Sequence, residues 1–142
     1  MKLQRSVETT ASPAEVFAYL SDFTHTEEWD PGTVTTTRVS GDGGVGTTYA
    51  NTSKFAGRET ELTYVVQEHV PDSRFVLRGT NKTVTATDTM EIAPVGTGSK
   101  VTYTADFEFQ GLAKLVVPFM GGAFKKLGDE AEEGLRTALA KL

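Results

Sequence analysis

Residues 111–142 have the sequence GLAKLVVPFMGGAFKKLGDEAEEGLRTALAKL, and this stretch decides the fold. Its apolar residues recur mostly at intervals of three or four, which is the spacing of one face of an α-helix. The members of this face are Leu112, Leu115, Val116, Phe119, Met120, Ala123, Leu127, Ala131, Leu135, Ala138, Leu139 and Leu142. Charged residues occupy most of the opposite side. A long helix with one apolar face needs a surface to pack on, and most of the chain upstream is predicted to form strands.

The upstream chain opens with alternating residues over 2–9, which predict a first strand. Ser12-Pro13-Ala14-Glu15 then predicts a helix start, because it combines a capping serine, a proline suited to the first turn and a glutamate at the capping-box position. This helix is expected to run to about Leu20. A second short helix is expected to end near Trp29, where Asp30-Pro31-Gly32 stops it.

Six further strands are predicted from segments rich in Thr, Val and Tyr. They lie near 33–40, 46–55, 58–69, 73–80, 83–93 and 99–110. Short joins that contain Gly, Pro, Asp or Asn separate them, and short joins make neighbouring strands antiparallel. The sequence therefore predicts one α+β domain over residues 1–142. Its seven-stranded curved antiparallel sheet would surround a long C-terminal helix, with two short helices after the first strand.

A sheet of this size is expected to be too wide for one helix to cover. Twist accumulates from strand to strand, so the sheet bends into a concave surface. A single helix is only about 10 Å wide. We therefore expect unfilled space between the sheet and the helix, and such a space could hold a ligand.

The C-terminal helix contains residues that interrupt helices. Pro118 has no amide hydrogen, and Gly121 and Gly122 each have low helix propensity. These residues predict a kink or break between Pro118 and Gly122. Two interpretations follow: the break is a hinge that opens the cavity for ligand entry, or it is a static bend that follows the curve of the sheet.

The composition argues against several classes of partner. Nineteen acidic and 14 basic residues give a formal net charge of −5, and no basic stripe suggests binding to nucleic acid. No cysteine is present, so disulfides and thiolate chemistry are excluded. No apolar run approaches the ~20 residues of a membrane span, and the first residues do not resemble a signal peptide, so we expect no membrane insertion and a cytoplasmic location. Neither a metal-ligand spacing nor a cofactor-binding motif occurs, so no metal or cofactor is expected.

Asp88 is the sharpest candidate for chemistry, because it lies on an otherwise apolar face of the strand near 83–93. A buried carboxylate needs a partner or acquires a raised pKa. It could act as a general acid or base or bind a ligand hydroxyl, or it could form an ion pair with Arg78 on the adjacent strand. Tyr49, Tyr64 and Tyr103 could point phenol groups at a developing enolate oxygen, or they could be core residues with their hydroxyls at its edge.

The order of these elements and three local motifs resemble the START-like (SRPBCC) superfamily. The motifs are ASPAEVF at 11–17, WDPG at 29–32 and GSKVTY at 98–103. The resemblance is closest to the group of polyketide cyclases and dehydrases, which also includes lipid-transport-like proteins. It implies a helix-grip fold and an apolar or aromatic ligand held between sheet and helix. The superfamily includes enzymes, carriers, receptors and adaptors, and it has no shared catalytic motif.

Together these observations predict binding of a small hydrophobic or aromatic ligand, lipid-like or polyketide-like, in the cavity. The first alternative is an enzyme of the polyketide cyclase/dehydratase type, with Asp88 and Tyr103 as candidate catalytic residues. The second is a module that binds a protein partner without a small ligand. The expected ligand-binding residues are Trp29, Tyr49, Tyr64, Leu77, Ala86, Asp88, Met90, Tyr103, Phe107, Phe119, Met120 and Phe124.

Overall fold

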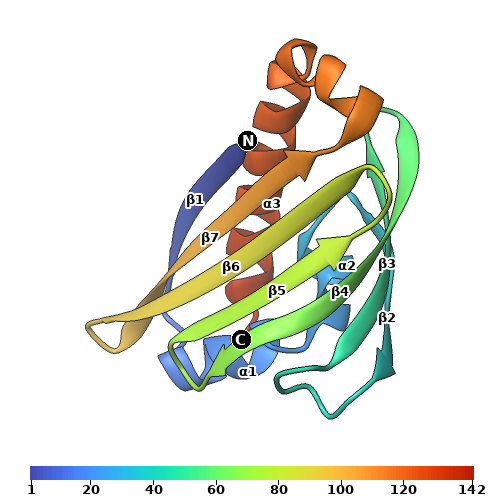
Figure 1. Cartoon of the computed structure of the whole chain (residues 1–142). Coiled ribbons are helices and arrows are strands. Elements are labelled where there is room, and N and C mark those ends of the chain that lie inside the picture. Colours follow the sequence, from blue (N-terminus) through green and yellow to red (C-terminus); the bar gives the residue numbers. More distant parts are fainter.

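The computed structural model describes residues 1–142, and its elements follow one another in the expected order (Figure 1). Strand β1 (Lys2–Thr9) is followed by α1 (Pro13–Leu20), the 3₁₀ helix η1 (Phe23–His25) and α2 (Thr26–Trp29). The other strands are β2 (Thr33–Ser40), β3 (Thr48–Phe55), β4 (Arg58–Val70), β5 (Arg74–Thr80), β6 (Val84–Val95) and β7 (Gly98–Phe109). The 3₁₀ helices η2 (Gly111–Leu115) and η3 (Val117–Phe119) and the helix α3 (Gly121–Leu139) complete the chain.

The seven strands form one antiparallel sheet in the order β1-β7-β6-β5-β4-β3-β2. Successive strands from β2 to β7 are neighbours, and β1 closes the sheet by pairing with β7. Figure 1 shows the sheet curving around α3, with α1 at the bottom of the view and α2 beside the lower part of α3. The predicted α+β architecture is confirmed. None of the helices combines the length and the apolar character needed to cross a membrane.

The inner face of the sheet is the one that the alternation predicts. In β6, Asp88 points inward among apolar residues, and in β5 the inward residues are Phe75 and Leu77, which pair with Met90 and Asp88. Alternation alone does not decide which residues of β5 point inward, because Val76 is apolar as well. Pairing with β6 resolves it, since directly opposed residues share a face.

The expected capping box starts α1. The Ser12 hydroxyl accepts a hydrogen bond from the Glu15 amide at 3.2 Å, and the Ser12 amide donates to the Glu15 carboxylate at 3.3 Å. Helix α1 buries Val16, Phe17 and Leu20 and packs against β5, β6 and β7. It therefore covers one end of the concave face, and α3 runs along the face beside β1, from Arg5 to Thr9.

The C-terminal helix is shorter than the sequence predicts, because α3 begins only at Gly121. A break occurs where it was predicted, but the segment before it forms the two 3₁₀ helices instead of the first turns of an α-helix. The apolar side chains of this segment, expected on the buried face, are exposed: Leu112 by 83%, Leu115 by 69% and Phe119 by 87%. The physical reason is that Pro118 cannot donate a helical hydrogen bond, so the α-helix does not continue through it. The side chains before Pro118 therefore do not lie on the buried face of α3.

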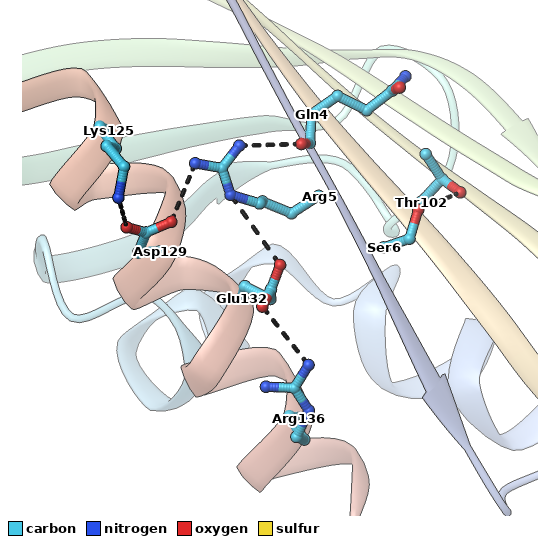
Figure 2. Close-up of polar contacts among 8 residues, drawn as sticks. All are labelled: Gln4, Arg5, Ser6, Thr102, Lys125, Asp129, Glu132 and Arg136. Atoms are coloured by element: carbon cyan, nitrogen blue, oxygen red, sulfur yellow. Dashed lines mark hydrogen bonds and ion pairs between the residues drawn. The ribbon is translucent and has the colours of Figure 1, made fainter. Parts of the chain in front are cut away.

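Helix α3 is attached to the sheet by its apolar face and by one cation. Phe124, Ala131, Leu135 and Leu139 are buried. Figure 2 shows Arg5 of β1 reaching across to α3, where its guanidinium donates to the Asp129 carboxylate at 3.1 Å and lies 4.0 Å from Glu132. Arg5 thereby joins the edge strand to the middle of the helix.

The closest approach to α3 is made by the backbone of α2. A Cβ atom added to Gly134 would overlap the carbonyl oxygen of Trp29. Glycine is therefore required at this position by the packing of two backbones rather than by its own conformation. Helix α3 holds the end of α2, and with it Trp29, in place.

We expect Gly134→Ala to destabilise the protein by roughly 1–3 kcal/mol, because an added methyl group must push α2 and α3 apart. The control is Gly122→Ala, where an added Cβ meets no atom within 4 Å and helix propensity favours alanine by about 1 kcal/mol. Urea denaturation of the two variants measures the difference. Equal stability of Gly134→Ala and the wild type would contradict the close contact.

We expect the backbone amides of residues 111–120 to exchange with solvent at least about tenfold faster than those of residues 127–139. The first segment consists of short 3₁₀ turns with exposed side chains, whereas the second lies in a packed α-helix. Hydrogen exchange measured by NMR tests this directly. Equal protection of the two segments would show that the hinge interpretation is wrong.

Candidate functional site

A cavity of about 150 Å³ lies between the inner face of the sheet and α3. Its walls are mainly apolar and aromatic, and they come from almost every layer of the fold. The hydrophobic lining residues are Leu3, Phe23, Trp29, Phe55, Leu62, Tyr64, Val84, Tyr103, Ala105, Phe107, Phe109, Phe124, Leu127 and Ala131. The sequence predicted unfilled space in this place from the mismatch between a wide sheet and one helix.

Four phenylalanines close the cavity at the end where α3 begins. Phe124, on the first turn of α3, is 2% exposed. Its ring centroid lies 4.9 Å from that of Phe55, 5.4 Å from that of Phe107 and 5.9 Å from that of Phe109. These contacts join the ends of β3 and β7 to α3, at the top of the view in Figure 1. Phe124 is therefore the side chain that α3 contributes to closing this end.

The polar lining of the cavity includes two carboxyl groups and two phenols, besides hydroxyl and amide side chains and Lys54. Asp88 comes from β6, Tyr103 from β7 and Tyr64 from β4, while Asp30 comes from the turn between α2 and β2. We call these four residues the polar cluster. The Trp29 ring stands nearly perpendicular to that of Tyr103, with centroids 5.4 Å apart. Aromatic surface therefore surrounds the acidic groups.

The Tyr64 ring has room to lie over the neighbouring strand β5 because the residue paired with it there is a glycine. Gly79 of β5 is paired with Tyr64, and a Cβ added to Gly79 would lie 2.6–2.8 Å from atoms of the Tyr64 ring. Gly79 also pairs with the small residue Ala86 of β6. These two small residues leave the volume that the Tyr64 ring occupies.

Asp88 is buried and has no cationic partner. The predicted ion pair with Arg78 is absent, because Arg78 pairs with Thr87 and is exposed on the outer face of the sheet. Burial raises the pKa of the Asp88 carboxyl to about 7, and the nearby Asp30 adds to the shift. The nearby Tyr103 hydroxyl favours the ionised carboxylate and lowers this pKa in part. A carboxyl group of this kind can give or take a proton near neutral pH.

The sequence did not identify Asp30 as a site residue. Its carboxylate accepts hydrogen bonds from the Gly32 amide at 3.1 Å and the Thr33 hydroxyl at 3.0 Å. Burial nevertheless raises the pKa of Asp30, and Glu130 of α3 also contributes. An aspartate followed by Pro-Gly-Thr is a recognisable turn signal, but the signal does not reveal that the turn lies against the cavity.

The structure brings only part of the predicted set together. The residues that line the cavity are Trp29, Tyr64, Asp88, Tyr103, Phe107 and Phe124. The residues that do not line it are Tyr49, Leu77, Ala86, Met90, Phe119 and Met120. Trp29 is almost fully buried, so it both lines the cavity and belongs to the core.

Two physical reasons explain the residues that lie elsewhere. Leu77 and Met90 point inward but are completely buried among core side chains. Ala86 is completely buried as well, between the cavity-lining residues Val84 and Asp88 of β6. Tyr49 is covered by Phe23, whose ring centroid lies 5.7 Å away. Phe119 and Met120 precede α3, and the change of helix type turns Phe119 to solvent.

Solved structures with similar folds are numerous. The Zhui aromatase/cyclase from Streptomyces sp. R1128 matches with a TM-score of 0.81 at 10% identity, covering 98% of this chain and 93% of that one. A START superfamily protein from Mycobacterium smegmatis matches with a TM-score of 0.80 at 12% identity, covering 97% and 96%. The di-domain aromatase/cyclase StfQ of the steffimycin biosynthetic pathway matches with a TM-score of 0.71 at 12% identity, covering 99% of this chain and 50% of that one.

At these identities the structural matches show the fold alone. No curated protein matches the sequence. The family model described as polyketide cyclase / dehydrase and lipid transport, however, matches residues 1–140. The predicted resemblance is thereby confirmed: the chain belongs to the polyketide cyclase/dehydrase and lipid transport family.

Proposed function

We propose that the protein binds a small hydrophobic or aromatic molecule, lipid-like or polyketide-like, in the cavity between the sheet and α3. The observation that carries this proposal is the cavity itself, which has apolar walls and no side chain to fill it. Well-packed interiors rarely leave a void of this size. An apolar cavity of ~150 Å³ is large enough to hold a benzene molecule, so the buried part of the ligand is about one ring in size.

A larger ligand has to displace the phenylalanine cluster or extend past it. Phe124 stands at the beginning of α3, directly after the segment 111–120 that packs least against the rest of the chain. Movement of that segment would carry Phe124 with it and widen the cavity. The segment is therefore a suitable entrance for a ligand, in agreement with the hinge interpretation.

We expect Ala105→Leu to abolish binding of a one-ring aromatic probe, because Ala105 is buried in the cavity wall and leucine would occupy the ligand volume. Its matched control is Ala93→Leu, at an exposed position of β6. NMR titration with toluene, and native mass spectrometry for any molecule retained from expression, compare these variants with the wild type. Binding that survives in Ala105→Leu, or is absent from the wild type, would contradict the proposed site.

Proton transfer is the second candidate function, and Asp88 is the observation that favours it. The carboxyl group has a pKa near neutrality, it faces the cavity, and the Tyr103 phenol lies beside it. This combination suits the cyclisation or dehydration of a carbonyl compound, since one group can move a proton while a phenol donates to the developing oxyanion. The name of the Zhui aromatase/cyclase supports the same reaction class.

We expect Asp88→Asn to increase the free energy of unfolding at pH 8. The folded-state pKa of Asp88 is about 7, which is above the ordinary value of 3.8. The folded state therefore binds the proton more tightly, and wild-type stability falls as the pH rises between these two values, by at most about 4 kcal/mol. Asparagine removes this contribution, so denaturation curves across this pH range should converge at low pH and separate above neutrality.

The control for this experiment is Asp106→Asn, on the outer face of β7, which should leave the pH dependence unchanged. A wild-type stability that is flat between about pH 4 and pH 7 would contradict the raised pKa. If the protein is an enzyme, its rate on a cyclising substrate should collapse in Asp88→Asn. A rate that persists in this variant would assign the proton transfer to another group.

A further inference from the structure

The cavity contains buried acidic groups and no buried basic group to balance them. Asp88 and Asp30 both line it, and the electrostatic influence of each carboxylate on the other side chains of the polar cluster shows that the two lie near one another. The one basic side chain in the lining is Lys54, which is exposed at the end of β3. Glu130 on α3 adds a further negative charge near Asp30.

Arg5 is a cation on the inner face of the sheet, but it is already engaged elsewhere. Arg5 pairs with Tyr103 across β1 and β7, so it shares the inner face with the polar cluster. Its guanidinium turns to α3 instead, where it contacts Asp129 and Glu132, and it also donates to the Gln4 carbonyl at 3.0 Å (Figure 2). Arg5 is not among the residues that line the cavity.

Aromatic rings complete the surroundings of the two carboxyl groups. Trp29, Tyr64 and Tyr103 all line the cavity beside them, and the Phe23 and Tyr64 ring centroids lie 4.8 Å apart. The faces of such rings attract cations, and the attraction is strongest where water is excluded. Carboxylates combined with aromatic rings are the chemistry that recognises an organic ammonium group.

We propose that the cavity binds a small aromatic amine with its ammonium group at the polar cluster, and that it rejects carboxylates of the same size. This inference rests on the proposed function, since it names the class of ligand for the same cavity. A carboxylate ligand would have to lose its hydration beside two acidic groups, with no cation inside to compensate. An ammonium ligand would instead pair with both carboxylates and lie against the rings.

The same arrangement gives the affinity a defined pH dependence. An ammonium group pairs with Asp88 only when that carboxyl group is ionised, and the free protein loses this proton near pH 7. Asp30 is held in place by Gly32 and Thr33, and both phenols of the cluster remain neutral because burial raises their pKa values. The affinity for the amine therefore rises as the pH increases through neutrality, until the amine itself loses its proton.

The test is NMR titration of the wild-type protein with four one-ring ligands: toluene, benzyl alcohol, benzylamine and benzoate. At about pH 8, where Asp88 is ionised, we expect benzylamine to bind at least about tenfold more tightly than toluene. Benzoate should bind most weakly of the four ligands. Benzylamine affinity should fall about tenfold between about pH 8 and pH 6, whereas toluene affinity should stay constant.

Asp88→Asn should remove the advantage of benzylamine over toluene and leave toluene affinity unchanged. Asp30→Asn should reduce the same advantage, and it provides a second measurement if the first variant folds poorly. Asp106→Asn is the matched control, because it removes a carboxylate from the outer face of β7. A merely structural role of Asp88 would weaken all four ligands alike and would overturn the proposal.

The charge selectivity of the cavity and its binding of small molecules can be disproved separately. If toluene and benzyl alcohol bind in the cavity but benzoate binds as tightly as benzylamine, the charge selectivity is wrong and the proposed hydrophobic site stands. If none of the four ligands perturbs the resonances of Tyr103 and Ala105, binding of small molecules in the cavity is itself wrong.

Discussion

The structure depends on one geometric mismatch, between a sheet that curves through seven strands and the single helix that covers it. An ordinary core would fill the concave face with side chains, and near α1 this happens, because Leu77 and Met90 are completely buried. Near the start of α3 the helix is too narrow and the cavity remains. The same mismatch places Asp30 and Asp88 where water is largely excluded but a ligand can approach.

This mismatch also explains why buried acidic groups are tolerated. Asp88 is costly to ionise in the absence of a cation, and its raised pKa expresses that cost. A hydrophobic residue of similar size would stabilise the domain more, so the carboxyl group is the kind of destabilising feature that function retains. Arg5 points inward from β1, two strands away from Asp88, but α3 draws its guanidinium away through Asp129 and Glu132.

Most of the fold and a part of the site could be predicted from sequence. Period-two alternation placed Asp88 and Tyr103 on the inner face, since strand geometry alone determines which side each residue takes. The break near Pro118 was predicted from local chemistry, but the loss of helical phase before it was not. Asp30 was missed because its location depends on how a turn docks against α3, and such long-range packing leaves no periodic pattern in the sequence.

Gly134 has a further consequence for motion. Its contact with the Trp29 carbonyl, together with the reach of Arg5 to the middle of α3, anchors the C-terminal half of that helix to α2 and β1. About the first two turns of α3, which carry Phe124, lie N-terminal to these attachments. A small tilt about the anchored part would therefore give a larger sideways displacement at the N-terminal end of the helix, where the four phenyl rings meet.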